Sequence, residues 1–138
     1  MDITEIPFNR LVGLVRAEKA GKVLSLPDDV RYTNHLGTIH ASALLTLAEA
    51  TSGEYMIREL ANPGFEVLPV VRRVEAKYRK PARGVVYSSV TVPPEKKAEF
   101  IATLTARGRA LLEIQVDVHD EQETHLVTVM VEWFVAKR

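Results

Sequence analysis

One long amphipathic helix, predicted from residue 41 to about residue 60, precedes a second half of the chain that reads mostly as strand. At about 100° per residue, one face of this helix carries Ala41, Leu44, Leu45, Ala48 and Ser52. Three residues are predicted to point away from that face: Arg58, Glu54 and Ala50. A twisted sheet wrapped around the helix would bury the apolar faces of both, so we expect an α+β fold of this kind.

The segments around the helix fit this interpretation. Helical spacing of Phe8, Leu11, Val12 and Val15 predicts a short first helix in an N-terminal extension of residues 1–20, and a strand follows at residues 22–26. Strands are also predicted at residues 65–78, 84–92, 109–119 and 126–136, with a surface helix from 95 to about 106 and a helix-ending turn at 62–64. The strand at 109–119 alternates polar and apolar residues, whereas the strand at 126–136 is apolar on both faces and therefore belongs inside the sheet.

Composition limits the classes of function. The 138 residues suit one domain, small enough that a sizeable pocket needs a second subunit, so we expect a homo-oligomer, either a dimer or a dimer of dimers. Lys plus Arg and Asp plus Glu are balanced at 18 each, which argues against nucleic acid or a membrane as a partner. The chain has no cysteine, its four histidines lack metal-ligand spacing, and it has no long apolar run. We therefore expect a cytoplasmic protein that binds no metal.

The junction before the long helix is the predicted site of chemistry. Residues 34–40 read Asn-His-Leu-Gly-Thr-Ile-His and lead directly into the helix, whose first backbone N–H groups can bind an oxygen that carries negative charge. Glu49 falls at the margin of the apolar face, where half-burial would suit it to act as a general base. A solvated or ion-paired Glu on a helix flank is the simpler alternative.

The order of these motifs resembles a known fold family. From about residue 22 to the C-terminus, the chain is similar to the hotdog fold, and within it to the 4-hydroxybenzoyl-CoA and phenylacetate-pathway group of acyl-CoA thioesterases and an uncharacterised subgroup of that superfamily. The matching residues are Asn34, Gly37-Thr38, His40, Glu49 and Tyr78-Arg79-Lys80-Pro81-Ala82. The resemblance implies one hotdog domain over residues 1–138 and an acyl-CoA, or another acyl thioester, as the substrate.

The resemblance also implies a role for each matching residue. Similar proteins hold the thioester carbonyl with the loop Asn and with the backbone N–H after the His, here Asn34 and Ala41, which follows His40. The helix acid, Glu49, would activate water or attack the thioester carbon. Residues expected to contact the substrate or the phosphates of coenzyme A are Gly37, Arg79, Lys80, Arg83 and Arg109. No cofactor is implied beyond the coenzyme A of the substrate.

Two departures from the family pattern keep other functions open. The chain has His40-Ala41-Ser42 where His-Gly-Gly is common, and Val71 stands where relatives of the human type place a water-orienting Ser seven residues before the strand Tyr. These departures favour an acyl-binding module without catalysis. A hotdog dehydratase is a further alternative, because its His and Glu stand fourteen residues apart, as His35 and Glu49 do.

Overall fold

The computed structural model describes residues 1–61 and 66–138. In chain order, its elements are η1 (Ile3–Glu5), α1 (Pro7–Val12), β1 (Val15–Arg16), β2 (Leu24–Leu26), η2 (Val30–Tyr32), α2 (Ala41–Ala61), β3 (Val67–Tyr78), β4 (Val86–Thr91), α3 (Pro94–Arg107), β5 (Arg109–Asp120) and β6 (His125–Lys137). The predicted turn at 62–64 and the first residue of the strand predicted at 65–78 lie outside the described residues.

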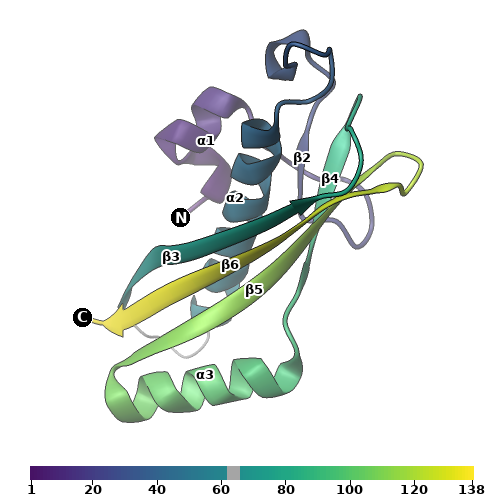
Figure 1. The fold of residues 1–138 in the computed structure, drawn as a ribbon. Helices are drawn as coiled ribbons and strands as arrows, with labels where there is room; N and C mark the ends of the chain where they lie inside the picture. The colour runs from purple at the N-terminus through teal and green to yellow at the C-terminus, as the bar shows by residue number, and fades with distance from the viewer. Residues whose placement is uncertain (62–65) are drawn as a thin grey trace.

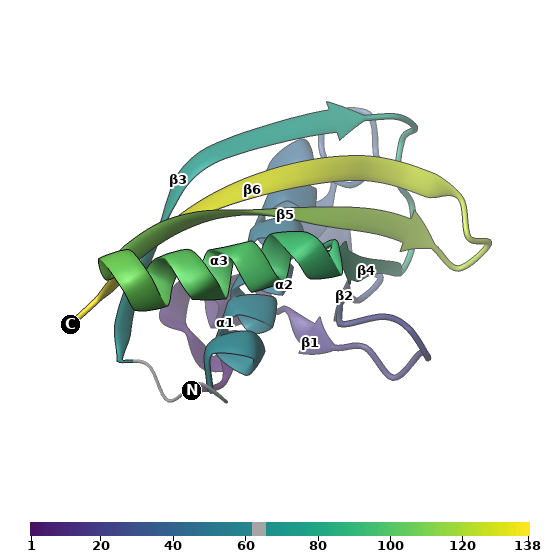
Figure 2. The same ribbon diagram turned by 90° about the horizontal axis from the view of Figure 1, so that it is seen from below.

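The strands of the described residues form one antiparallel sheet in the order β1-β2-β4-β5-β6-β3. β6 lies between β5 and β3, which confirms its predicted place inside the sheet. α2 crosses behind the sheet with α1 beside it (Figure 1), and β3, β6 and β5 arch over the helix when the molecule is seen from below (Figure 2). The predicted α+β architecture, a sheet wrapped around a long helix, is therefore confirmed.

The core lies between α2 and the inner face of the sheet, where the helix packs against β5, β4, β6 and β2. Alternate residues of β5 are buried: Ala110, Leu112, Ile114, Val116 and Val118. Two polar contacts cross this core. Thr51 of α2 hydrogen-bonds Ser88 of β4 at 2.6 Å, and Trp133 of β6 donates its indole N–H to Ser52 Oγ at 2.9 Å. Because these hydroxyl groups have partners, their burial does not carry the cost of an unsatisfied polar group.

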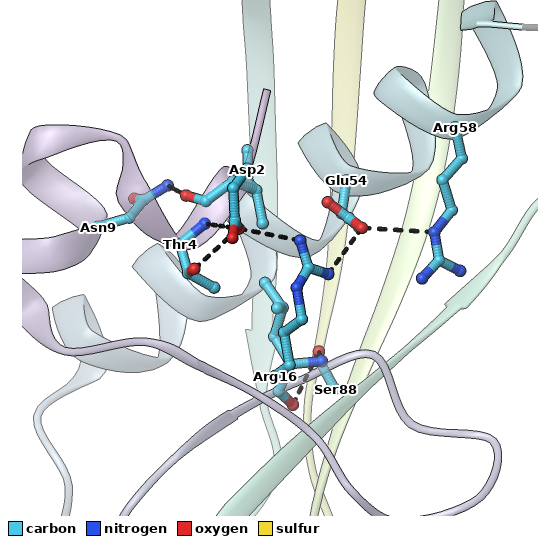
Figure 3. A network of polar contacts seen from close by, with 9 residues as sticks. Asp2, Thr4, Asn9, Arg16, Glu54, Arg58 and Ser88 are labelled. Atoms are coloured by element: carbon cyan, nitrogen blue, oxygen red, sulfur yellow. Dashed lines mark hydrogen bonds and ion pairs between the residues drawn. The ribbon is translucent and has the colours of Figure 1, made fainter.

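The opposite side of α2 is also covered, so the predicted outward face was wrong for two of its three residues. Ala50 and Glu54 are each only 5% exposed. Arg16 reaches Glu54 from the N-terminal segment, with Nη1 and Oε1 2.8 Å apart, and also contacts Asp2, with Nη2 and Oδ1 2.9 Å apart (Figure 3). Arg58 Nε approaches the same Glu54 oxygen at 3.3 Å. The N-terminal segment is thus fastened to the helix over a carboxylate that it helps to bury.

The first helix ends earlier than the helical spacing predicted. Gly13 adopts a φ of 91° and closes α1, so Val15 is not helical and instead joins β1. A Cβ at Gly13 would come within 2.7 Å of Tyr32 Oη, which explains why glycine suits this turn. β1 was not predicted, because two residues are too few to show alternation.

β3 is an edge strand with one side unpaired among the residues that the structure describes. Three of its apolar side chains are exposed: Leu68 at 50%, Val70 at 54% and Val74 at 36%. The first half of β3 is thus an exposed and largely apolar edge, and such an edge invites pairing with another strand. The sheet therefore offers one edge that a second chain can extend.

Candidate functional site

The loop before α2 is organised by the side chain of Asn34. Its Oδ1 accepts hydrogen bonds from the backbone N–H groups of Leu36 (2.9 Å) and Thr38 (3.2 Å). Its Nδ2 donates to Thr38 Oγ1 at 2.9 Å, which leaves one of its two N–H groups for a ligand. Gly37 takes a φ of 74° and closes the turn back to the Asn34 carbonyl. The Asn and Gly of the motif thus build the loop.

The start of α2 combines a side-chain cap with a free amide. His40 Nδ1 accepts from the backbone N–H of Ser42 at 3.0 Å, so this side chain caps the start of the helix. The N–H of Ala41 donates to no protein acceptor within residues 1–61 and 66–138. An oxygen carrying partial negative charge can therefore bind at Ala41 without displacing a protein contact.

The two motifs singled out in the sequence meet in space. The N–H of Ile39 donates to the Ala82 carbonyl at 2.9 Å, and Tyr78 Oη donates to the Ala41 carbonyl at 3.1 Å. Burial raises the pKa of the Tyr78 phenol, so its proton is retained for this contact. Tyr78 was expected only as part of the motif that matches the fold family, and its contact between the end of β3 and the first turn of α2 was not predicted.

A cavity of about 320 Å³ lies where the motifs meet. Its lining consists of Asn34, Thr38, Ile39, Ala41, Leu44, Tyr78, Arg79, Lys80, Pro81 and Ala82. The structure therefore gathers both predicted carbonyl-binding groups, on Asn34 and Ala41, and two of the predicted phosphate-binding cations, Arg79 and Lys80, around one space. Thr38 and Leu44 complete the wall and were not predicted as site residues.

The other predicted cations lie elsewhere. Arg83 is exposed and donates to the Gly37 carbonyl at 3.2 Å, on the neighbouring side of the loop. Arg109 is the first residue of β5. Tyr78, at the cavity, pairs with Val127 of β6, and Val127 pairs in turn with Val118 of β5, so Val118 marks the level of the cavity along β5. Nine residues of strand at about 3.3 Å each separate the two levels, about 30 Å. Within one chain, Arg109 is not brought to this cavity.

Glu49 is exposed rather than half-buried, so that expectation was wrong for the single chain. No hydrogen bond or ion pair of its carboxylate occurs in the described part of the chain. Its backbone carbonyl accepts from Ser52 Oγ at 2.6 Å, and the indole of Trp133 donates to that same hydroxyl oxygen. Eight residues of helix separate Glu49 from Ala41, which places their Cα atoms about 12 Å apart along the axis. Glu49, the expected base, and Ala41, the expected oxyanion donor, therefore lie on the same helix but about two turns apart.

The two histidines of the motif do not enter the cavity. His35 is exposed in the turn, and His40 lines a separate groove of about 500 Å³ between α1 and α2, with Phe8 and Leu11. In the parts of the chain that the structure covers, no three His, Asp or Glu side chains are grouped to hold a metal ion. Likewise, none of the helices found there is both long and apolar enough to cross a membrane.

Val71 lies next to a break in the register of β3. It pairs with Trp133, while Arg73 pairs with Glu132, so Arg72 is the extra residue of a bulge. Val71 is partly buried against the core. Counting seven residues back from Tyr78 crosses this bulge, so the count does not correspond to seven steps of a regular ladder.

Comparison with known proteins follows from this geometry. The sequence profile of the family DUF4442, described as a domain of unknown function, matches residues 11–135. The chain belongs to the DUF4442 family. A comparison with curated proteins finds no match.

Solved structures relate this DUF4442 chain to the thioesterase-like hotdog superfamily. A Pseudomonas aeruginosa protein described as of unknown function, "Probable Thioesterase", is 26% identical, with a TM-score of 0.79 over 99% of this chain and 91% of that one. A variant of a Staphylococcus aureus thioesterase shares the fold at 10% identity, with a TM-score of 0.67 over 94% and 98% of the two chains. A Bacillus halodurans protein solved with CoA has 17% identity and a TM-score of 0.64, over 81% of this chain and 65% of that one. The predicted hotdog fold and the resemblance to thioesterases are thereby confirmed.

Proposed function

We propose that this DUF4442 protein is a thioesterase that hydrolyses an acyl-CoA to a carboxylic acid and free CoA. One observation carries the proposal: an unused backbone N–H at the start of α2, a spare N–H of Asn34 and two cations line the same cavity. The thioesterase-like fold supports this reaction class. The structure of a similarly folded protein with CoA supports the choice of coenzyme.

The reaction divides among the chain's own groups. The thioester carbonyl oxygen would accept hydrogen bonds from the Ala41 N–H and from Asn34 Nδ2, which stabilise the charge that develops on it. Glu49 would take a proton from water as the water oxygen bonds to the carbonyl carbon, or would attack that carbon itself. In the first route, collapse of the tetrahedral intermediate breaks the C–S bond, and Glu49 returns the proton to the leaving thiolate. In the second route, the collapse leaves an acyl–Glu49 anhydride, which water hydrolyses to the carboxylic acid and free Glu49 while the thiolate takes up the proton that this water releases.

Two features support a homodimer as the working form. About 12 Å of helix axis separates Glu49 from Ala41, so we propose that Glu49 of one subunit serves the Ala41 site of the other. The exposed apolar edge of β3 offers the surface on which a second chain can extend the sheet. Assembly through this edge would also cover the exposed flank of α2 that carries Glu49.

A panel of acyl-CoAs assayed with a thiol-reactive chromophore tests the proposal, because this cysteine-free chain does not consume the reagent. Asn34→Asp is the sharpest variant for the carbonyl site. It keeps the oxygen that accepts from Leu36 and Thr38 but loses the donor, so we expect kcat to fall about 100-fold with the fold retained. Asn9→Asp removes a comparable donor in α1, where Nδ2 contacts the Ile3 carbonyl, and should leave kcat unchanged.

The alternatives give different outcomes in the same assay. A chain that binds acyl-CoAs but hydrolyses none of them would be an acyl-binding module. A dehydratase would hydrate an enoyl thioester and would lose activity equally in His35→Ala and Glu49→Gln. A thioesterase should keep substantial turnover in His35→Ala, because His35 lies exposed in the loop.

A further inference from the structure

A chain of hydrogen bonds on the outer face of the sheet, the face away from α2, ends at the cavity. Arg79 follows β3 and donates from Nε to Thr128 Oγ1 on β6 at 3.1 Å. Thr128 Oγ1 in turn lies 2.9 Å from Asp117 Oδ1 on β5, and the two residues are direct cross-strand partners. Because Arg79 also lines the cavity, this outer-face network holds the side chain of a residue that belongs to the candidate site.

Asp117 is the fixed point of the network. Its side chain is only 15% exposed and takes further hydrogen bonds from Gln115 Nε2 at 2.9 Å and His125 Nε2 at 2.8 Å. Burial raises the pKa of Asp117, but hydrogen bonds from Gln115, Thr128 and His125 outweigh it and hold the pKa below its usual value. An ionised carboxylate there draws the Thr128 hydroxyl proton to itself, which leaves an oxygen lone pair for Arg79.

This arrangement decides which part of the guanidinium is available to a ligand. The Nε–H is used by Thr128, while neither Nη group has a hydrogen-bond partner in the described parts of the chain. The two Nη groups form the end of the fork that binds phosphate oxygens bidentately. A side chain held in this orientation before binding loses less conformational freedom when the ligand arrives.

We propose that Thr128 and Asp117 are positioning residues for Arg79, and that they make the site favour thioesters whose thiol half carries phosphate groups. The inference rests on the proposed function and adds the feature by which the substrate's thiol half is selected. It predicts discrimination between an acyl-CoA and the same acyl group on pantetheine, which carries no phosphate.

Thr128→Val removes the hydroxyl at nearly constant volume and is the first test. We expect KM for the acyl-CoA to rise about 5-fold, the effect of one hydrogen bond, with kcat unchanged. KM for the acyl-pantetheine should not change. Thr128→Ser should restore the wild-type values. Thr105→Val is the matched control, since its hydroxyl bonds the Ile101 carbonyl on α3, away from the cavity.

Equal increases in KM for both substrates would mean a merely structural role and would overturn the proposal, as would unchanged KM for both. If the wild type hydrolyses nothing, the proposed function fails, and titration with CoA and with pantetheine replaces the assay. Weaker binding of CoA alone by Thr128→Val would then still support the positioning role. Absence of CoA binding by the wild type would refute it. Should Thr128→Val not fold, Asp117→Asn should show the same selective effect, at about 2-fold.

Discussion

Two carboxylates on α2, five residues apart, have opposite surroundings. Glu49 is exposed and contacts no charged or hydrogen-bonding side chain of the described residues, whereas Glu54 is 5% exposed and contacts both Arg16 and Arg58. The hydrogen bond to Glu54 raises the pKa of Arg16, so the guanidinium stays charged. Glu54, whose charge is balanced by two arginines, is poorly placed to accept and release protons. Glu49, which has no such partner within residues 1–61 and 66–138, is the carboxylate that we propose for the chemistry.

A Glu→Gln substitution can be made at either carboxylate, and the largest effect on activity should come from the one at Glu49. Glu49→Gln removes the group that accepts a proton or attacks carbon, so kcat for acyl-CoA hydrolysis should fall about 10²–10⁴-fold. Thermal unfolding should be unchanged, because the side chain has no partner to lose among the described residues. Glu95→Gln, on the exposed first turn of α3, is the control. Full activity in Glu49→Gln would contradict the assignment.

Assembly is the next expected effect, because the proposed dimer supplies what Glu49 lacks within its own chain. Val70→Lys places a charge on the apolar edge of β3 and should give monomers by light scattering, with activity reduced about 100-fold through loss of site geometry. Leu111→Lys is the matched control. Leu111 is also exposed and stands in the same row across the sheet, but on β5, which is an inner strand between β4 and β6 rather than an edge strand. A fully active monomer would contradict the proposal that two subunits share each site.

Substitution of Glu54, the ion-paired carboxylate, should lower stability and leave activity unchanged, the reverse of the effect expected at Glu49. Glu54→Gln weakens the contacts to two arginines, and because both guanidinium groups are partly exposed, the free energy of unfolding should fall by only about 1.5 kcal/mol. Activity per folded molecule should stay at the wild-type level. Denaturant unfolding and the thiol assay on the same sample measure both quantities. A loss of kcat without a loss of stability would make Glu54 part of the catalytic machinery.

The smallest effect concerns the two arginines themselves. Among the described residues, Arg58 pairs with Glu54 alone, and its side chain is 65% exposed, so Arg58→Ala should cost about 0.5 kcal/mol or less. Arg16→Ala should cost more, because Arg16 also fastens Asp2. Denaturant unfolding of both variants ranks them. The opposite ranking would mean that the N-terminal segment is not held by this network.

The sequence predicted the helix and strands well where the pattern is long. α2 and the alternating strand β5 extend over many residues, so periodicity identified them. The two carboxylates were assigned the wrong environments for a physical reason. A helical wheel assumes one buried face, but α2 is covered by the sheet on one side and by the N-terminal segment on the other. Arg16, one of the two partners of Glu54, stands 38 positions away in the sequence, which no local pattern reveals.

The predicted site residues also fall into two groups, those that the fold brings to the cavity and those that it does not. Asn34 and Ala41 were identified by resemblance to a family and Arg79 and Lys80 by their charge, and the fold brings all four together. Arg109 was included because its charge suits phosphate, but the length of β5 carries it to the far end of the sheet. The contact between Arg79 and Thr128 depends on strand register, which the sequence does not specify closely enough to predict.

The contact between Trp133 and Ser52 gives this chain a built-in optical probe. Trp133 is the one tryptophan in the sequence, and its indole N–H is bonded to a hydroxyl that itself bonds the backbone of Glu49. Indole emission depends on this hydrogen bond and on local polarity. A ligand that shifts the Glu49 turn of α2 will therefore change the fluorescence of the unlabelled protein, so occupancy of the site can be followed in real time.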